Sequence, residues 1–469
     1  MTGLRIFNTL TNKLEYLTTE DKNEVKVYVC GITAYDLTHI GHARSIVIFD
    51  VIVRYLRHKG LKVKFVRNFT DVDDKIIKRA REEGEAASEI AQKYIQEFKK
   101  DTHQLGLIAP DFEPKVTENI QDIIKLIETL IEKGFAYESG GDVYFSVEKF
   151  KDYGKLSKRT REEMLAGARV EPSENKKNPL DFALWKSSKK DEPFWDSPWG
   201  KGRPGWHIEC SLMAMKYLGE TIDIHAGGQD LIFPHHENEI AQSEAASGKP
   251  FAKYWLHAGH LSMKGEKMSK SLGNVINLKD IYKDFLPETL RFFIVKHHYR
   301  SPVEFSIEAL EEAERTLAKF YLTLEDLLDD RIKIEENDFS KKILSDFESS
   351  MDNDFNTPEA ISKVFLYFEE LKTERKTPEK IGGFVYSLKK ISEVLGVFGD
   401  NSFTEKLISL RLEKAKKSRE QIDSLVQERE RLRKERRFKE ADLIREELVK
   451  IGLYIQDKSC GSKIVPLTF

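Results

Sequence analysis

A strand–helix–strand run near the N-terminus constrains the fold of this chain more than any other segment. Apolar and polar residues alternate over 25–30, which predicts a strand. Apolar residues then recur at helical spacing over 46–56 until Gly60, and 61–66 predicts a second strand. A βαβ unit of this kind belongs to a parallel sheet, and such sheets bind ligands at the carboxyl ends of their strands.

Later segments extend this arrangement into several domains. Strand-like segments return at 221–225 and 254–257, with a helix expected from about Pro234, and beyond 300 apolar residues recur at helical spacing. We therefore expect an α/β fold: a doubly wound, Rossmann-like parallel-sheet domain with an insertion, then an all-α bundle and a small mixed C-terminal domain. The expected bounds are 1–112 and 201–265 for the two halves of the sheet domain, 113–200 for the insertion, 266–305 for a lysine-bearing loop and the region after it, 306–400 for the bundle and 401–469 for the last domain.

Composition favours a globular protein of the reducing cytoplasm. The 469 residues carry 33% charged side chains and a net charge of −3, so attraction to nucleic acid would have to come from a local patch. No segment approaches the ~18 uninterrupted apolar residues of a spanning helix, and residues 1–10 lack the pattern of a signal or transit peptide. Three cysteines do not make a disulfide framework. We expect a cytoplasmic protein without a membrane segment.

Two histidines lie three residues apart after the first predicted strand, in His39-Ile40-Gly41-His42. On the first turn of a helix they would face the same way, beside free backbone N–H groups and the positive end of the helix dipole. Imidazoles placed there can donate hydrogen bonds to phosphoryl oxygens as charge develops. The competing interpretation is a capping and packing role for both rings.

A cationic loop is expected much later in the chain, at Lys267-Met268-Ser269-Lys270-Ser271. Gly265 and Gly273 flank it and permit movement, and its lysines supply point charges for phosphates. A lysine-rich surface turn is common, so the loop alone is moderate evidence. The histidine pair and the loop, in this order, indicate ATP-dependent acyl activation.

A third group of residues could bind a metal. Cys30 ends the first strand, Cys210 closes the segment 205–210, and His235 and Glu239 are four residues apart at a predicted helix start. Two thiolates, an imidazole and a carboxylate suit zinc. Spacing this wide leaves alternatives open, because each cysteine could be a buried free thiol. The competing ligands are His207, His225 and His236.

The C-terminal region combines an amphipathic helix with a run of basic side chains. Apolar residues at helical spacing over 438–451 predict a helix that Gly452 would cap, and a short strand is expected at 463–467. The run 428–439 holds seven Lys and Arg against three Glu. It is either a solvated helix with internal salt bridges or a patch for phosphates.

At these residues the chain resembles the bacterial-type cysteinyl-tRNA synthetases, a family of class I aminoacyl-tRNA synthetases. The resemblance runs essentially end to end and is far more specific than the histidine and lysine pair alone. It rests on the segments 29–33 (Val-Cys-Gly-Ile-Thr), 39–42, 67–71 (Arg-Asn-Phe-Thr-Asp), 202–207 (Gly-Arg-Pro-Gly-Trp-His), 233–239 (Phe-Pro-His-His-Glu-Asn-Glu), 267–271 and 352–357 (Asp-Asn-Asp-Phe-Asn-Thr).

This resemblance implies an activity and a set of functional residues. The implied activity is formation of cysteinyl-adenylate from L-cysteine and ATP with Mg²⁺, followed by transfer to the 3′ end of tRNA(Cys), by a monomer. One zinc ion per chain would recognise the substrate thiolate. Its implied ligands are Cys30, Cys210, His235 and Glu239. The implied catalytic residues are His39, His42, Lys267 and Lys270; the ATP contacts are Ile40, Gly41 and Lys270; the substrate contacts are Gly31, Thr33, Thr70, Trp206 and His207.

The same resemblance assigns tRNA binding to the later regions. Residues 266–305 would contact the tRNA stem and 401–469 would read the anticodon. The candidate backbone contacts are Arg429, Arg431, Arg433, Lys434, Arg436 and Arg437. Two alternative functions would require only some of these residues and regions. A ligase that joins cysteine to an amino-sugar would share the ATP and zinc residues but lack the long tail, and a non-catalytic regulator would bind tRNA or cysteine without intact histidines and lysines.

Overall fold

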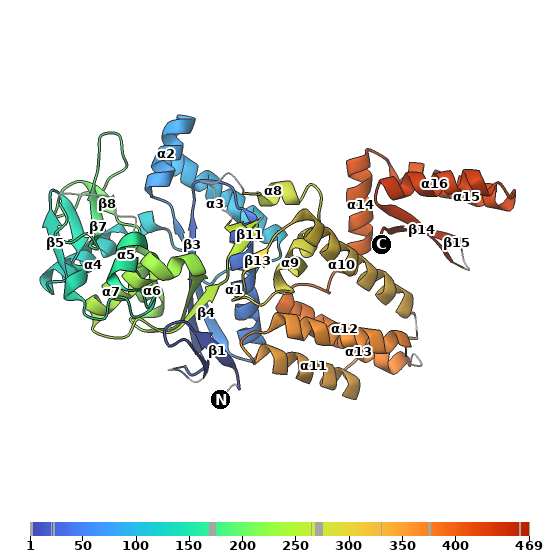
Figure 1. Cartoon of the computed structure of the whole chain (residues 1–469), viewed down its shortest axis with the longest axis horizontal. Helices are drawn as coiled ribbons and strands as arrows, with labels where there is room; N and C mark the ends of the chain where they lie inside the picture. The colour runs from blue at the N-terminus through green and yellow to red at the C-terminus, as the bar shows by residue number, and fades with distance from the viewer. Residues whose placement is uncertain are drawn as a thin grey trace. The chain divides into compact units, whose positions relative to one another are not determined.

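The computed structural model describes residues 3–19, 21, 24–167, 175–263, 265–267, 275–329, 331–373, 377–458 and 461–468 (Figure 1). The chain divides into two compact units. The first unit comprises Met1–His260 and two later segments, Tyr299–Pro302 and Asp352–Phe355. The second comprises Leu261–His298, Val303–Met351 and Asn356–Phe469.

A four-stranded parallel sheet forms the centre of the first unit. Its strands, in spatial order, are β10 (Ala252–Ala258), β9 (Ile222–Gly228), β3 (Glu24–Thr33) and β4 (Lys62–Thr70). Val27 of β3 lies in register with Phe65 on one side and Ile224 on the other. Apolar residues on both faces are buried, as a parallel sheet covered by helices requires. The predicted α/β parallel-sheet fold is confirmed.

Helices cover this sheet. The helix α1 (Ile40–His58) connects β3 to β4 and completes the predicted βαβ unit, and its apolar stripe is buried. The helices α6 (Ile208–Leu218) and α7 (Glu237–Ser247) pack with Tyr28 and Val66 in one hydrophobic cluster. The first unit also contains the hairpin of β1 (Arg5–Asn8) and β2 (Lys13–Tyr16), and the paired helices α2 (Asp74–Glu83) and α3 (Ala87–Gln104).

A second, antiparallel sheet lies between β4 and β9 in the sequence. Its strands are β5 (Ala136–Ser139), β6 (Asp142–Phe145), β7 (Phe182–Ser187) and β8 (Gly202–Pro204), in that order. The helix α4 (Ile120–Glu132) precedes it, and α5 (Arg161–Gly167) follows β6. Apolar residues of α4, β6 and β7 join the same hydrophobic cluster as α6 and α7, so this segment packs on the sheet domain.

The chain between His260 and Asp352 leaves and re-enters the first unit. Arg5 of β1 exchanges backbone hydrogen bonds with this returning chain, its N–H donating to Asp352 O and its carbonyl accepting from Asp354 N, both at 2.8 Å. The buried Arg44 of α1 donates from Nε to Gly259 O at 2.9 Å and from Nη2 to Ser301 O at 2.5 Å. These hydrogen bonds connect both later segments, 299–302 and 352–355, to the sheet domain.

The second unit is mainly helical, as expected beyond residue 300. It begins with a three-stranded sheet of β11 (Leu261–Met263), β12 (Glu266–Lys267) and β13 (Val303–Glu304). Its helices are α8 (Leu278–Ile281), α9 (Pro287–Val295), α10 (Ile307–Leu327), α11 (Asp338–Met351), α12 (Thr357–Thr373), α13 (Pro378–Leu395) and α14 (Phe403–Ala415). The C-terminal end contains α15 (Arg419–Lys434), α16 (Phe438–Lys450) and the hairpin of β14 (Leu453–Lys458) and β15 (Gly461–Pro466), which pack together (Figure 1).

Two element bounds agree with the sequence expectations. Phe233 has an extended backbone (φ −140°, ψ 132°), as residues before proline prefer, and helical backbone follows it from about Pro234 and continues into α7 at Glu237. The C-terminal helix ends at Lys450, and Gly452 takes a left-handed conformation (φ 77°) just after it. Within the described parts of the chain, no helix combines the length and apolar character needed to cross a membrane.

Candidate metal and substrate site

Four segments of the first unit meet at the carboxyl edge of the parallel sheet. Cys30 lies near the end of β3, and Cys210 is in the first turn of α6. His235 lies in the turn before α7, and Glu239 is in the first turn of that helix. Carboxyl ends of parallel strands share one edge, so residues far apart in sequence become neighbours there.

The distances among these four side chains suit a zinc ion. Cys30 Sγ lies 3.9 Å from Cys210 Sγ and 3.4 Å from Glu239 Oε1, and His235 Nε2 lies 3.0 Å from Glu239 Oε1. One ligand atom from each residue lies within 4.8 Å of the other three. Ligands of a tetrahedral zinc ion stand roughly 3.3–3.8 Å apart. The soft thiols and the borderline imidazole therefore fit zinc in chemistry and in spacing.

A second group of four side chains overlaps the first. It consists of Cys30, His225, His236 and Glu239, which again place one ligand atom each within 4.8 Å of one another. Cys30 Sγ lies 3.3 Å from His236 Nε2 and 3.6 Å from His225 Nε2. Sequence reasoning named both histidines as competitors, and the structure brings them to the same cluster.

Burial and mutual contacts fix the charges in this cluster. The Cys30 thiol donates toward Cys210 and lowers the pKa of Cys210 to about 6, although burial opposes this. Burial alone would raise the pKa of Glu239, but the His225 and His235 rings hold it well below its usual range. Burial would lower the pKa of His235, whereas Glu239 and Cys210 raise it to about 10. Cys210 and Glu239 are therefore the groups held as anions, whereas burial and the neighbouring Cys210 raise the pKa of Cys30 well above its usual range.

Two expected substrate contacts, Trp206 and His207, pack against this cluster. The Trp206 ring stacks on His235 with centroids 4.5 Å apart and planes 29° apart, and His207 Nδ1 lies 2.9 Å from His235 Nδ1. Burial, and then the neighbouring His235, lower the pKa of His207 well below its usual range. His207 is therefore neutral and orients the His235 ring.

Gly31, Thr33 and Thr70 lie where β3 and β4 run side by side. Gly31 N donates to Asn68 Oδ1 at 2.9 Å, and a Cβ at Gly31 would lie only 1.6 Å from Asn68 O. Thr33 lies in register with Thr70, whose hydroxyl donates to Glu209 Oε2 at 2.7 Å. This close approach of two strands requires glycine at position 31.

Sequence reasoning gave no role to Asn68 and Glu209. Asn68 Oδ1 lies 3.7 Å from Cys210 Sγ as well as accepting from Gly31 N. Glu209 is 1% exposed, and its burial, followed by the charge of Cys210, raises its pKa well above the usual range. Asn68 lies inside the segment 67–71, which carried the resemblance, whereas the only signal for Glu209 was its position next to Cys210.

His39 and His42 flank the start of α1. His39 is the N-cap: its Nδ1 accepts from His42 N at 3.2 Å, and the two rings stack with centroids 3.6 Å apart. The structure confirms the capping interpretation, and the roles expected of both histidines toward ATP stay predictions. Ile40 is fully buried, and a Cβ at Gly41 would lie 3.0 Å from the His39 ring, so neither residue presents a side chain for ATP.

The lysine loop is described only at its first residue. The backbone of Lys267 lies in β12, and residues 268–271, including Lys270, lie outside the described residues. The roles expected for both lysines stay predictions.

The basic run near the C-terminus is partly occupied by internal ion pairs. Arg429 is 1% exposed and donates both Nη atoms to Asp457 at 2.7 and 2.9 Å. Arg433 also reaches Asp457, at 2.6 Å, and Arg431 pairs with Glu428 at 2.7 Å. Arg429 therefore serves the packing of this end, and we remove it from the surface expected to contact phosphates. The exposed candidates are Arg431, Arg433, Lys434, Arg436 and Arg437.

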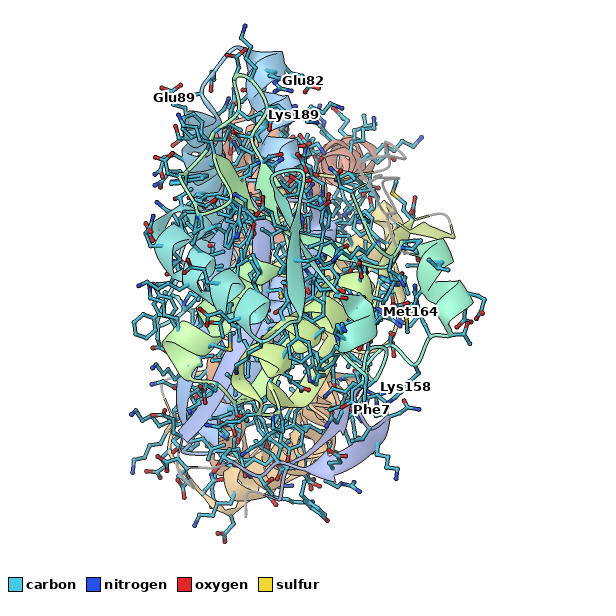
Figure 2. The ribbon with its side chains drawn as sticks, turned by 90° about the vertical axis from the view of Figure 1, so that its left-hand side faces the viewer. Phe7, Glu82, Glu89, Lys158, Met164 and Lys189 are labelled. Atoms are coloured by element: carbon cyan, nitrogen blue, oxygen red, sulfur yellow. The ribbon has the colours of Figure 1, made fainter. Side chains whose placement is uncertain are left out.

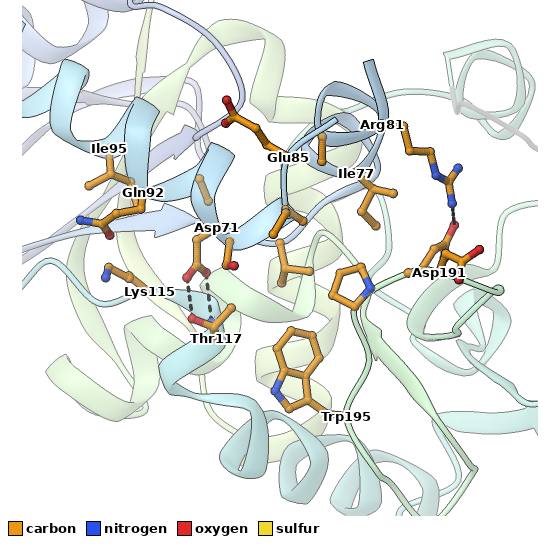
Figure 3. A pocket seen from close by; sticks show the side chains of 18 of the residues that line it. Asp71, Ile77, Arg81, Glu85, Gln92, Ile95, Lys115, Thr117, Asp191 and Trp195 are labelled. Carbon is orange, nitrogen blue, oxygen red and sulfur yellow. Dashed lines mark hydrogen bonds and ion pairs between the residues drawn. The ribbon is translucent and has the colours of Figure 1, made fainter. Parts of the chain in front are cut away.

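A cavity of about 800 Å³ lies elsewhere in the first unit, between the α2–α3 pair and the loop 191–195 (Figure 3). Figure 2 shows Glu82 and Glu89 of this helix pair at the same end of the unit as Lys189. The carboxylate of Asp71 lines the cavity and accepts from Thr117 N and Oγ1 at 3.0 and 2.5 Å. Burial raises the pKa of Asp71. The residues lining this cavity include none of the expected site residues.

Comparison with known proteins assigns the chain to a class of proteins. Residues 16–315 match the family of class I (C) tRNA synthetase catalytic domains. Residues 346–399 match the DALR domain. The fold resembles that of Mycobacterium tuberculosis methionyl-tRNA synthetase in complex with methionyl-adenylate, with a TM-score of 0.60 at 15% identity over 85% of this chain and 95% of that one. The sheet domain is thus that of a class I aminoacyl-tRNA synthetase.

The C-terminal end and the full-length relatives narrow this class to one family. Residues 417–462 match the cysteinyl-tRNA ligase anticodon-binding domain. The chain is 51% identical to the cysteine–tRNA ligase of Thermodesulfovibrio yellowstonii, over 97% of this chain and 98% of that protein. It is 49% identical to the cysteine–tRNA ligase of Persephonella marina, over 98% and 99%. The chain belongs to the cysteine–tRNA ligase family.

Proposed function

We propose that this enzyme activates L-cysteine with ATP and transfers the cysteinyl group to the 3′ end of tRNA(Cys). One observation carries the proposal: two thiols, an imidazole and a carboxylate converge at the sheet edge of a class I catalytic domain. The C-terminal match to an anticodon-binding domain disfavours a ligase that acts on an amino-sugar. The intact histidine pair and four converging ligands disfavour a non-catalytic regulator.

Cys30, Cys210, His235 and Glu239 would hold one zinc ion. When bound, zinc supplies a Lewis-acid position that prefers a thiolate to a hydroxyl and so separates cysteine from serine. A site built around one polar group of the substrate can discriminate by ~10⁴ without an editing domain.

Other residues shape the amino-acid site. Trp206 and His207 hold the His235 ring from one side, which fixes its orientation toward Glu239. Thr70 and Glu209 form a buried hydrogen bond next to Cys210, and Gly31 keeps the strands close enough for Asn68 to reach the cluster. Cys210, His235 and Glu239 are buried, so electrostatic interactions among them are strong.

The start of α1 would bind the triphosphate of ATP, with Mg²⁺. Backbone N–H groups at this helix end and the dipole attract phosphate, and capping fixes both histidine rings beside them. The histidines would donate hydrogen bonds to the phosphoryl oxygens as charge develops, and Lys267 and Lys270 would neutralise the departing pyrophosphate. The substrate carboxylate attacks the α-phosphorus and releases pyrophosphate.

The exposed arginines and lysine of 431–437 would contact the tRNA backbone, within the region that matches an anticodon-binding domain. We place the enzyme in the cytoplasm, as a monomer, where Cys30 and Cys210 stay reduced.

Cysteine-dependent exchange of pyrophosphate into ATP tests this function. The purified protein should catalyse the exchange with cysteine but not with serine or methionine, and zinc chelation should abolish it. Lack of exchange by folded, zinc-loaded protein would favour the regulator. Exchange without charging of tRNA(Cys) would restrict the proposal to the activation step.

Two cysteine variants separate the metal site from general thiol effects. Cys30→Ala should lose both zinc and cysteine-dependent exchange, whereas Cys460→Ala, at a cysteine that is not among the four expected ligands, should keep both. Equal zinc content in the two variants would exclude Cys30 as a ligand. For the tRNA surface, Arg433→Glu should weaken charging and spare exchange, and an equal loss of both activities would contradict a role in tRNA binding.

A further inference from the structure

The metal cluster offers more donor groups than one tetrahedral ion needs. We propose that His225 and His236 form a reserve pair of ligands, which keeps the zinc ion bound when Cys210 or His235 is lost. This inference rests on the proposed function only in assuming that the cluster binds zinc. Cys30 and Glu239 are common to both sets of four and would be required in either.

The carboxylate of Glu239 contacts one histidine of each set of ligands. Its Oε1 atom lies 3.0 Å from His235 Nε2, and its Oε2 atom lies 3.1 Å from His225 Nε2. Each oxygen therefore faces a histidine of a different set. A carboxylate that can bind through either oxygen can stay coordinated while its partner ligand changes.

Cys30 is placed equally well for both sets. Its Sγ atom lies 3.3 Å from His236 Nε2, 3.6 Å from His225 Nε2 and 3.9 Å from Cys210 Sγ. Sulfur and nitrogen ligands of a tetrahedral zinc ion stand roughly 3.6 Å apart, and two sulfur ligands roughly 3.8 Å. On spacing alone, the reserve set fits as well as the first.

His236 also has the outer contact that a ligating histidine usually has. Its Nδ1 atom lies 2.8 Å from His257 Nε2, and His257 Nδ1 lies 2.8 Å from Thr9 Oγ1. A ring nitrogen held by an outer partner fixes the tautomer and leaves the other nitrogen for the metal. Here the other nitrogen, Nε2, faces Cys30.

His225 is held firmly toward the cluster. It is fully buried, stacks on Tyr28 with planes 7° apart, and contacts the Trp255 ring. The competing explanation is that His225 and His236 are packing residues that offset the buried charge of Glu239. In that case their loss would affect stability but not metal retention, even when Cys210 is absent.

Metal content of the purified full-length protein and its variants distinguishes these explanations. After extensive dialysis, Cys210→Ala should retain close to one zinc ion per chain. Cys30→Ala should lose the ion. The double variant Cys210→Ala/His225→Gln should lose it as well, while His225→Gln alone should retain it and serve as the folding control.

Cobalt substitution tests which ligands remain, independently of activity. In cobalt-loaded Cys210→Ala, the thiolate charge-transfer absorption should fall by about half, because one of two thiolates is gone, and the visible bands should stay those of a four-coordinate ion. Cobalt-loaded Cys460→Ala should match the unchanged protein.

Two results would overturn the reserve pair. One is loss of zinc from Cys210→Ala with circular dichroism unchanged; the other is full zinc retention by the double variant. Absence of zinc from the unchanged protein would instead refute the zinc part of the proposed function. Two ions per unchanged chain would show that the sets act together rather than in reserve.

Discussion

Glu288 should make the stability of the helical unit depend on pH. It lies in the first turn of α9, where its carboxylate accepts from Tyr321 Oη at 2.6 Å and from Phe398 N at 2.8 Å. Burial raises the pKa of Glu288 from 4.5 to about 7, and these two hydrogen bonds oppose the rise. Asp400 raises this pKa further, whereas Lys406 lowers it.

The direction and size of the effect follow from this pKa. Below about pH 4.5 the carboxyl is protonated in both folded and unfolded chains, so its contribution to stability is complete. As pH rises from 4.5 to 7 the unfolded chain releases the proton and the folded chain keeps it, so the free energy of unfolding falls. A pKa about 2.5 above the usual value corresponds to roughly 3 kcal/mol, lost by about pH 7.

Urea unfolding of the Glu288→Gln variant, followed by circular dichroism between pH 4.5 and 8.5, measures this contribution. The amide does not titrate, so the variant should gain about 3 kcal/mol relative to the unchanged protein between pH 4.5 and pH 8.5. Glu312→Gln, at an exposed position of α10, provides the matched control. Parallel pH profiles for the unchanged protein and Glu288→Gln would refute the reasoning.

Three further substitutions follow from other buried contacts. Arg44→Met removes the donors to Gly259 O and Ser301 O. Gly259 is buried, and a buried carbonyl left without a partner costs about 1–3 kcal/mol, so tryptophan fluorescence should show the sheet domain melting several degrees lower; an unchanged midpoint would contradict this. Gly31→Ala places a Cβ against Asn68 O and should cost at least about 3 kcal/mol, and soluble yield with normal zinc content would disprove the steric argument. Asp457→Asn removes the charge partner of the buried Arg429 and should destabilise the α15–α16 end by about 2 kcal/mol, seen as faster limited proteolysis there; an unchanged cleavage rate would count against it.

The sheet domain was predictable because local patterns determine it. Alternating apolar residues over 25–30 and helical spacing over 46–56 reflect burial on a strand and a helix, and both elements formed where expected. The helical backbone near Pro234 also starts where expected, after the extended Phe233, since the backbone before proline resists the helical conformation.

The ligand geometry could not be predicted from residue spacing. The resemblance named Cys30, Cys210, His235 and Glu239, and the structure brings them together. Which histidine lies near Cys30, however, depends on how a strand, a turn and a helix converge, and no periodicity encodes that distance.

Burial of single charged residues was equally inaccessible from the sequence. Arg429 belongs to a basic run and appeared available for phosphate. Its partner Asp457 lies on the β14 strand, after a helix and a turn, so the ion pair depends on tertiary packing. Charge patterning reports composition along a helix and not which side chain is enclosed.

The first unit is built from three segments that are separated in the sequence, and this has a consequence for synthesis on the ribosome. Its hydrogen bonds from β1 and α1 reach Ser301 and Asp354, and its last segment ends at Phe355. The four strands of the parallel sheet are complete at Ala258, but the contacts of the last segment with β1 cannot form until residue 355 has left the exit tunnel. A fragment cut at 315, where the catalytic family match ends, would lack this last segment. Domains usually fold as they emerge, N-terminal first. Here the N-terminal unit is completed by a segment made long after it, so a shortened form that keeps all of these contacts has to extend through Phe355.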